Sequence, residues 1–350
     1  MLTSCPSPLA RASDLTPLSA SRQRRWLGTL LLWLALCASL ALSVAFGARV
    51  THWADITGLL DGSLDSMAEA AVASRLSRTL LAMLAGAALG VSGAVMQGLT
   101  RNPLADPGLL GVNAGAALAV VIGIAWFGIQ QASDYLWLAI LGAGLSAVVV
   151  YLIASLGRGG ATPLRLALSG AVISAALSSL STAIILPRAD IGGLIQSWLI
   201  GGVGGATWAQ ITPALPFLLS GLLICGLSAR RLNLLALGDD MASGLGERVA
   251  RVRVMAALGA ILLCGGITAV CGPIAFVGLV VPHVCRLMAG SDYRWILPLS
   301  ALAGALLLTS ADILGRLIAR PAELDVGIMT ALVGAPFFIW IVRRHKVKSL

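Results

Sequence analysis

Long apolar runs separated by short polar segments are the dominant pattern of this sequence. A helix needs about 20 mainly apolar residues to cross the hydrocarbon core of a bilayer. Ten runs reach or approach that length, and they lie at about 26–46, 79–99, 109–129, 135–156, 166–186, 213–229, 254–272, 274–289, 295–315 and 326–342. The pattern therefore predicts an all-α polytopic membrane protein with about ten transmembrane helices. The sixth and eighth runs are short, and only Gly272-Pro273 separates the seventh from the eighth.

The runs predict a single transmembrane domain over residues 26–342, with short tails at 1–25 and 343–350. Arg22, Arg24 and Arg25 precede the first run, as basic residues do in a signal peptide. The apolar core of a signal peptide has about 7–15 residues, and this run is longer. We therefore predict an uncleaved first span.

Composition agrees with a membrane protein and sets its orientation. Hydrophobic residues make up 58% of the chain and charged residues only 11%, whereas soluble domains have about 25% charged residues. If both termini are cytoplasmic, 18 of the 24 basic residues fall on the inner side, as expected for cytoplasmic loops. The net charge of +9 is then a consequence of topology, and nucleic acid is not an expected partner.

Few residues offer catalytic or metal chemistry. Lys346 and Lys348 are the only lysines, so the chain lacks the lysine that a P-loop places on nucleotide phosphates. If ATP drives this protein, another subunit binds it together with Mg²⁺. The six cysteines show no C-x-x-C spacing and the three histidines are dispersed, which predicts no metal site. His283, beside Pro282, is expected to pack rather than to bind a ligand.

Two proline-containing segments resemble each other. Residues 103–109 and 273–279 share Pro, Ala, Gly and Leu at the same offsets. The first follows a span that runs inward and the second a span that runs outward, as in an inverted repeat with broken helices near the substrate path. Chance similarity in a chain rich in glycine and alanine is the alternative. The first segment could equally be a structural turn.

Charged residues near the predicted outer face have two interpretations. Arg75 and Arg78 lie three residues apart on one helix face, where they can anchor the helix end or dock an acidic partner. Asp312 and Arg316 are spaced to pair within the ninth span, and we expect Arg320, Glu323 and Asp325 to join them near the outer interface.

The longest inner loop, about 230–253, has mixed charge and apolar positions. Asp239 or Asp240 can cap a helix, and Gly244 or Gly246 can end one. The loop predicts two short amphipathic helices joined by glycine. Such a segment suits docking of a peripheral subunit, and a helix lying on the membrane surface is the alternative.

Several ordered motifs between about Arg75 and Arg344 resemble the FecCD/BtuC-type permease family of ABC importers, which take up ferric siderophores, haem and cobalamin in bacteria. They are Arg75-Leu-Ser-Arg78, Gly86 to Gln97, Arg101 to Gly111, Ala236-Leu-Gly238, Gly278 to His283, Ala311-Asp312, Ala322 to Leu324 and Gly334-Ala-Pro336. The family usually has Pro where this chain has Ser77.

The resemblance implies a type II importer permease fold and a homodimer around a central pathway. It also implies two cytoplasmic ATPase subunits, a periplasmic binding protein and a place in the bacterial inner membrane. By motif position, docking to the binding protein falls on Arg75, Arg78 and Arg316. Coupling to the ATPase falls on Leu237, Gly238, Asp239, Asp240, Ala242, Leu245, Gly246, Val249 and Arg253. Motif residues near the pathway are Gln97, Asn102, Pro103, Pro107, Gly108, Pro273, Gly278 and Pro282.

The expected function is inward transport of a ferric siderophore-type chelate by alternating access, with no catalytic residue and no cofactor in this chain. A haem or cobalamin importer is the alternative within the family. An ion-coupled secondary transporter is the alternative of another class, but it would need unpaired acids deep in the spans, and Asp312 is the only candidate that the sequence indicates.

Overall fold

The computed structural model describes residues 18–47, 67–129, 132–156 and 162–344. Within these ranges the chain is helical and contains no strand. The helices are α1 (Leu18–Ala45), α3 (Met67–Thr100), η1 (Gly108–Leu110), α4 (Val112–Phe127), α5 (Ala132–Ser155), α6 (Pro163–Ile185), α7 (Ala189–Ile200), α8 (Trp208–Leu235), α9 (Asp239–Gly244), α10 (Val249–Cys271), α11 (Val277–Ala289), α12 (Tyr293–Ile318) and α13 (Val326–Arg344).

Each of the ten predicted runs falls on a helix of its own, which confirms the predicted fold class. Seven of these helices are long and apolar enough to cross a membrane. The other three, α4, α11 and α13, are apolar but shorter. α7, which is not among the predicted spans, has 12 residues, or about 18 Å of helix, too short to cross.

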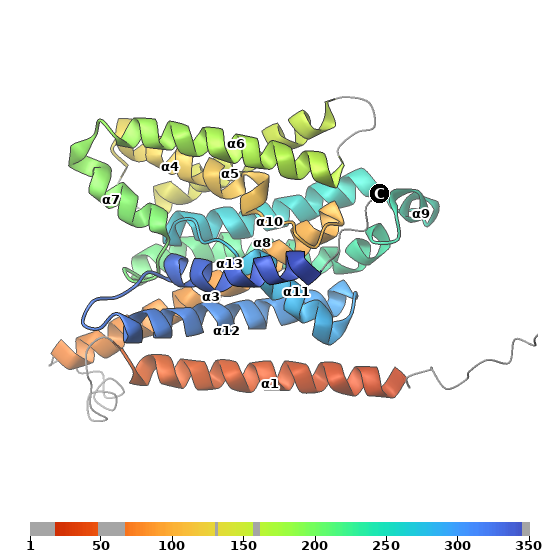
Figure 1. Ribbon diagram of the computed structural model, residues 1–350, viewed down its shortest axis with the longest axis horizontal. Helices are drawn as coiled ribbons and strands as arrows, with labels where there is room; N and C mark the ends of the chain where they lie inside the picture. Colours follow the sequence, from red (N-terminus) through yellow and green to blue (C-terminus); the bar gives the residue numbers. More distant parts are fainter. Residues whose placement is uncertain (1–17, 48–66, 130–131, 157–161, 345–350) are drawn as a thin grey trace, which may run out of the picture.

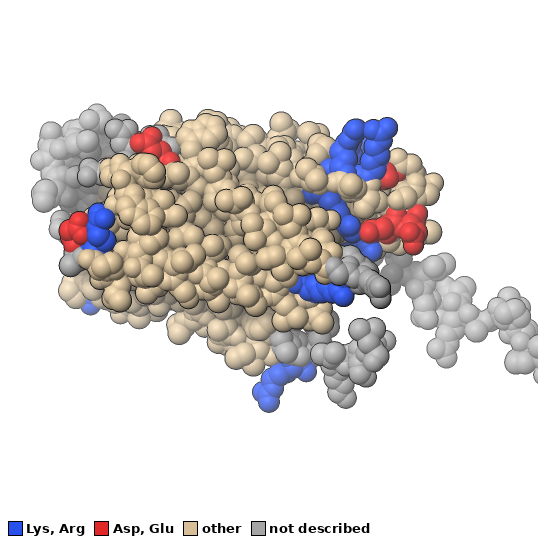
Figure 2. Space-filling model, turned by 90° about the horizontal axis from the view of Figure 1, so that it is seen from above, with Lys and Arg blue, Asp and Glu red and all other residues tan. Residues whose placement is uncertain are grey.

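The long helices run side by side, with α7 at one end of the bundle and α9 at the other (Figure 1). We call these the α7 end and the α9 end. α1 begins and α13 finishes at the α9 end. Charged side chains gather at the two ends of the visible face, and the band between them is uncharged (Figure 2). This distribution suits a bundle that crosses a bilayer from end to end.

α3 is the central helix of the bundle and packs against α12, α10 and α11. Its backbone touches that of its neighbours at two glycine pairs. A methyl group on Gly86 would overlap the backbone of Gly304 in α12, and one on Gly93 would overlap Gly278 in α11. Small residues allow such close approach where no hydrophobic drive joins helices in lipid.

Three helices extend beyond their predicted apolar runs. α8 is not short, because it begins at Trp208, continues through Pro213 and Pro216 and reaches Leu235. α3 begins at Met67, and α1 begins at Leu18, inside the predicted tail. Apolar runs mark the part of a helix that lies in hydrocarbon, whereas a helix can continue into water on either side.

The inner loop also differs from its prediction. It contains one short helix, α9, rather than two. Residues 230–235 complete α8, and residues 249–253 begin α10. The sequence predictions for residues 1–17 and 345–350 lie outside the described residues.

Candidate functional site

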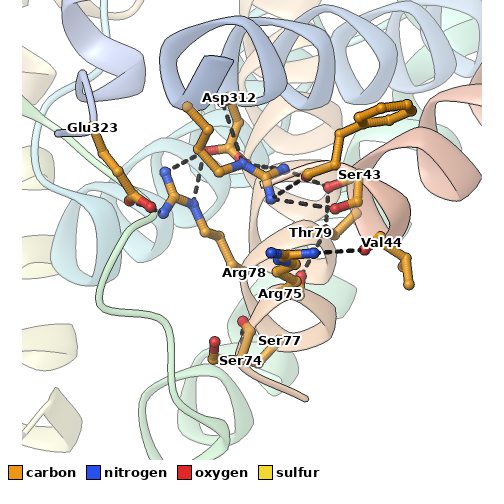
Figure 3. A network of polar contacts seen from close by, with 11 residues as sticks. Ser43, Val44, Ser74, Arg75, Ser77, Arg78, Thr79, Asp312 and Glu323 are labelled. Carbon is orange, nitrogen blue, oxygen red and sulfur yellow. Dashed lines mark hydrogen bonds and ion pairs between the residues drawn. The ribbon is translucent and has the colours of Figure 1, made fainter. Parts of the chain in front are cut away.

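Four elements meet in a buried charged cluster at the α7 end of the bundle. α3 contributes Arg75 and Arg78, α12 contributes Asp312 and Arg316, and the segment after α12 contributes Glu323. The end of α1 completes the cluster with backbone carbonyl groups (Figure 3). We call these five side chains the outer arginine cluster.

Asp312 lies at the centre of this cluster and pairs with two arginines. Its Oδ1 is 2.7 Å from Nη2 of Arg78, and its Oδ2 is 2.9 Å from Nη2 of Arg316. Arg78 also pairs with Glu323, whose side chain is 40% exposed. The predicted pair of Asp312 and Arg316 is therefore confirmed, and Glu323 joins it.

The other N–H groups of the cluster donate hydrogen bonds to the last residues of α1. Arg316 donates to the Oγ of Ser43 at 2.6 Å and to its carbonyl oxygen at 3.2 Å. Arg75 donates to the carbonyl of Val44 at 3.1 Å. The last carbonyls of a helix have no partner within the helix, so the arginines provide one.

All three predicted docking arginines are buried in this structure. Their exposed fractions are 6% for Arg75, 7% for Arg78 and 1% for Arg316. Docking stays a prediction, and it requires these side chains to exchange internal partners for a partner's acids. Arg320, also expected in the cluster, donates instead to the carbonyl of Gly47.

Two further residues lie beside this cluster. Ser77, which stands where the family usually has Pro, donates to the carbonyl of Ala206 at 2.9 Å. Partial burial raises the pKa of Asp325, while the charge of Arg78 works against the rise and that of Glu323 adds to it.

A second site lies within the bundle, where the two predicted repeat segments meet. Residues 101–111 follow α3 and lead to the short α4, while residues 272–276 follow α10 and lead to the short α11. The carboxylate of Asp106, in the first segment, lies against Gly278, in the first turn of α11. Gly278 in turn touches Gly93, about 10 Å along α3 from its last residue. Both segments therefore lie inside the helix bundle, as expected where a helix is interrupted within a membrane domain.

Gln97 of α3 supplies a hydrogen bond that the backbone of α11 lacks. Proline has no N–H, so Pro282 cannot donate to the carbonyl four residues earlier, which belongs to Gly278. The Nε2 of Gln97 donates to that carbonyl at 3.2 Å and lies 3.4 Å from the carbonyl oxygen of Leu279. Gln97 is 2% exposed. Three predicted motif residues, Gln97, Gly278 and Pro282, therefore form one hydrogen-bonded unit.

Arg286 forms a hydrogen bond with the oxygen of the Gln97 side-chain amide. It donates to the Oε1 of Gln97 and, at 3.1 Å, to the hydroxyl of Tyr293. Asn233 joins Tyr293 to Asp292 at the start of α12. Partial burial would raise the pKa of Asp292, but hydrogen bonds from Asn233 and Arg294 hold it below its ordinary value. No pattern in the sequence indicated the roles of Arg286, Asn233 or Tyr293.

Asp106 is a buried acid that the hydropathy pattern did not indicate. We expected only Asp312 to be an acid deep in the bundle, yet Asp106 is 8% exposed and accepts from the backbone N–H of Gly108 at 2.9 Å. Asn113 lies nearby and its Oδ1 accepts from the thiol of Cys264 at 2.9 Å. The flanking prolines indicated a turn and gave no sign that the turn is buried.

The predicted coupling segment forms an exposed corner at the α9 end (Figure 1). Gly238 and Gly246 flank α9 with φ angles of 118° and 85°, which residues with side chains rarely adopt. Ala242 is fully buried, whereas Leu237, Met241 and Leu245 are exposed. Asp239 accepts from both Arg101 and Arg253. Three exposed apolar side chains therefore lie in α9 or directly beside it.

The described residues contain no group of three His, Cys, Asp or Glu side chains that could hold a metal ion. The ring of His283 packs edge-on against Phe337 of α13, with 6.0 Å between ring centroids. This contact agrees with the packing role expected for His283.

Comparison with known proteins places these features in a family context. Residues 32–344 match the model of the FecCD transport family. The chain is 43% identical over 316 residues to the ferric enterobactin permease FepD of Escherichia coli, covering 89% of this chain and 94% of that protein. It is 40% identical over 278 residues to the hemin permease HmuU of Yersinia pestis, covering 78% of this chain and 82% of that protein.

A solved structure agrees with the fold. A metal-chelate type ABC transporter in an inward-facing conformation superposes with a TM-score of 0.78 at 28% identity, covering 91% of this chain and 99% of that one. PsaBC from Streptococcus pneumoniae, at 16% identity and a TM-score of 0.59, supports the fold alone.

A double-mutant cycle tests the role of Gln97. Gln97→Ala leaves the carbonyl of Gly278 without its donor, at a cost of about 1–3 kcal/mol. Pro282→Ala restores a backbone N–H, so we expect Gln97→Ala to cost less in the Pro282→Ala background. Thermal unfolding of the detergent-solubilised protein measures both. Equal costs in the two backgrounds would show that Gln97 does not replace the missing donor.

Asp312→Asn should strongly destabilise the protein. It leaves Arg78 and Arg316 buried without their shared carboxylate, and breaking a buried ion pair costs about 3–5 kcal/mol. The exposed pair of Arg188 and Asp190 provides the control, because Asp190→Asn should cost about 1 kcal/mol or less. Similar melting temperatures for the two variants would contradict the central role of Asp312.

Proposed function

The chain belongs to the FecCD transport family, and from this premise we propose that it is the transmembrane permease subunit of an ATP-driven importer that moves a ferric siderophore-type chelate into the cytoplasm. The observation that carries the proposal is the 43% identity to the ferric enterobactin permease over 89% of this chain. Two other relatives are an iron(3+)-hydroxamate permease and a probable siderophore permease of Bacillus subtilis. The hemin permease at 40% identity favours haem as the second candidate.

We propose that ATP and Mg²⁺ bind to two partner subunits rather than to this chain. Support comes from the sequence, whose only lysines are Lys346 and Lys348, so no P-loop lysine is available. The exposed apolar side chains in and beside α9 offer those subunits a contact surface. The α9 end would then be cytoplasmic, with both termini there, and the membrane would be the bacterial inner membrane.

A second copy of the chain is the remaining proposed membrane partner. α6 supports this proposal, because only 17% of its most apolar window is buried within the subunit. Leu164, Leu168, Val172 and Leu180 are exposed on it, and either lipid or a second subunit must cover them. A pathway between two copies would handle a bulky chelate with few polar side chains.

Docking of a periplasmic binding protein is proposed for the outer arginine cluster. The outer arginine cluster contains three arginines and only two acids, so its net charge is positive. One of these acids, Glu323, is half-exposed. Acids on the binding protein could take the place of Glu323 beside Arg78. Such an exchange would open the cluster only when the partner arrives.

Reconstituted vesicles test the transport function. The permease, its ATPase and its binding protein are incorporated together, and uptake of ferric enterobactin, a ferric hydroxamate, ferric citrate and hemin is compared. We expect ATP-dependent uptake of an iron siderophore in preference to hemin, and no uptake when the ATPase is omitted. Uptake without ATPase would instead identify a secondary transporter, and preference for hemin would identify a haem importer.

Two variants with opposite expected effects test docking. Arg75→Glu combined with Arg78→Glu should weaken binding of the binding protein, because like charges repel the partner's acids. Glu323→Gln should strengthen binding, because it frees Arg78 while leaving Asp312 in place. Affinity is measured on the purified permease–ATPase complex. If Glu323→Gln folds normally and the affinity does not change, the proposed exchange is refuted.

A further inference from the structure

Asp239, the first residue of α9, joins three segments of the chain. Its Oδ1 accepts from Nη2 of Arg101, which lies in the segment after α3. Nη2 of Arg253, in the second turn of α10, lies 3.0 Å from Oδ1 and 2.9 Å from Oδ2 of the same carboxylate. A single side chain of α9 is thus tied to the segment that leads into the bundle and to a long helix.

The segment that begins at Arg101 is held in successive turns. Arg101 itself has a φ of 50°, in the left-handed region that residues other than glycine seldom adopt. Asn102 then accepts from the backbone N–H of Leu104 through its side chain and from that of Ala105 through its carbonyl, and Asp106 accepts from Gly108. Since these bonds fix the turns, a displacement of Arg101 is passed along the segment.

The segment ends against the interior of the bundle. Asp106 lies against Gly278 in the first turn of α11, and the carbonyl of Gly278 is the one that Gln97 holds. A continuous chain of contacts therefore runs from α9 through Asp239, Arg101 and Asp106 to α11. Coupling between distant sites is carried by such contiguous contacts.

The energetics show that the Asp239 contacts do little for stability. The side chains of Arg101 and Asp239 are 37% and 44% exposed, and ion pairs at that exposure contribute at most about 1 kcal/mol. α9 is otherwise anchored by the buried Ala242 and flanked by Gly238 and Gly246. These three charges therefore tie α9 to two neighbouring segments while they contribute little to the stability of the fold.

We propose that Asp239 is a coupling pin, the positioning residue through which movement of α9 is passed to residues 101–111 by Arg101 and to α10 by Arg253. The inference rests on the proposed function, in which α9 contacts the ATPase. Without the pin, α9 would turn about its flanking glycines and leave the interior of the bundle in place. ATP would then be hydrolysed without transport.

The test uses the complete importer in vesicles, with the chelate selected by the uptake assay described above. In Asp239→Asn we expect the ATPase to stay bound and to hydrolyse ATP, while chelate transported per ATP falls at least about fivefold, the lower end of typical coupling between sites. Asp190→Asn, which removes an exposed acid from the pair with Arg188, is the matched control and should transport normally. Normal transport per ATP in Asp239→Asn would overturn the proposal.

Two further measurements separate the pin from other roles. Arg101→Gln should lower transport per ATP on its own. It should add little to the loss in Asp239→Asn, because both changes remove the same contact. Additive losses in the double variant would contradict the proposal. If Asp239→Asn alone releases the ATPase, Asp239 is a docking contact and the pin is refuted. If the unmodified permease does not bind an ATPase at all, the proposed function fails instead.

Discussion

Hydrocarbon offers a peptide backbone no hydrogen-bond partner, so every break in a helix within a membrane must be satisfied by the protein itself. Among the described residues, the helices are interrupted in the interior before α4 and before α11, and Pro282 is one of several prolines that lie inside a helix. Each break has a specific partner. Asp106 accepts from Gly108, the carbonyl of Cys271 accepts from Gly202, and the carbonyl of Gly278 accepts from Gln97. Much of the polar chemistry inside the bundle exists to close these gaps.

Close backbone packing makes the repair at Pro282 geometrically feasible. Gly93 and Gly278 let α3 and α11 touch without side chains between them. Gln97 lies one turn further along α3, on the same face as Gly93, and is therefore within reach of the α11 carbonyls. A larger residue at either glycine would separate the helices and also withdraw the amide from its acceptor. The glycines and the glutamine thus act together, although only the glutamine has a polar side chain.

Hydropathy alone predicted the approximate positions of the apolar helices, because the apolar length that a bilayer demands is a property of local sequence. It did not predict where helices end, since α8 continues beyond its apolar run on both sides. The pair of Asp312 and Arg316 followed from helical spacing, but its burial with Arg78 depends on a different helix. Gln97 stood out as part of a motif, yet its role becomes clear only beside Pro282. Asp106 escaped notice because burial of a turn depends on the path of the whole chain.

The outer arginine cluster also affects how the protein is made. The end of α1 is completed by Arg316, which lies 273 residues after Ser43. At ribosomal rates of about 5–20 residues per second, this interval corresponds to roughly 15–55 s of synthesis. During that time the Ser43 hydroxyl can bond Thr79 of α3, which follows only 36 residues later. α1 can therefore contact α3 long before α12 has been made, and Arg316 of α12 can bond the end of α1 only after that interval.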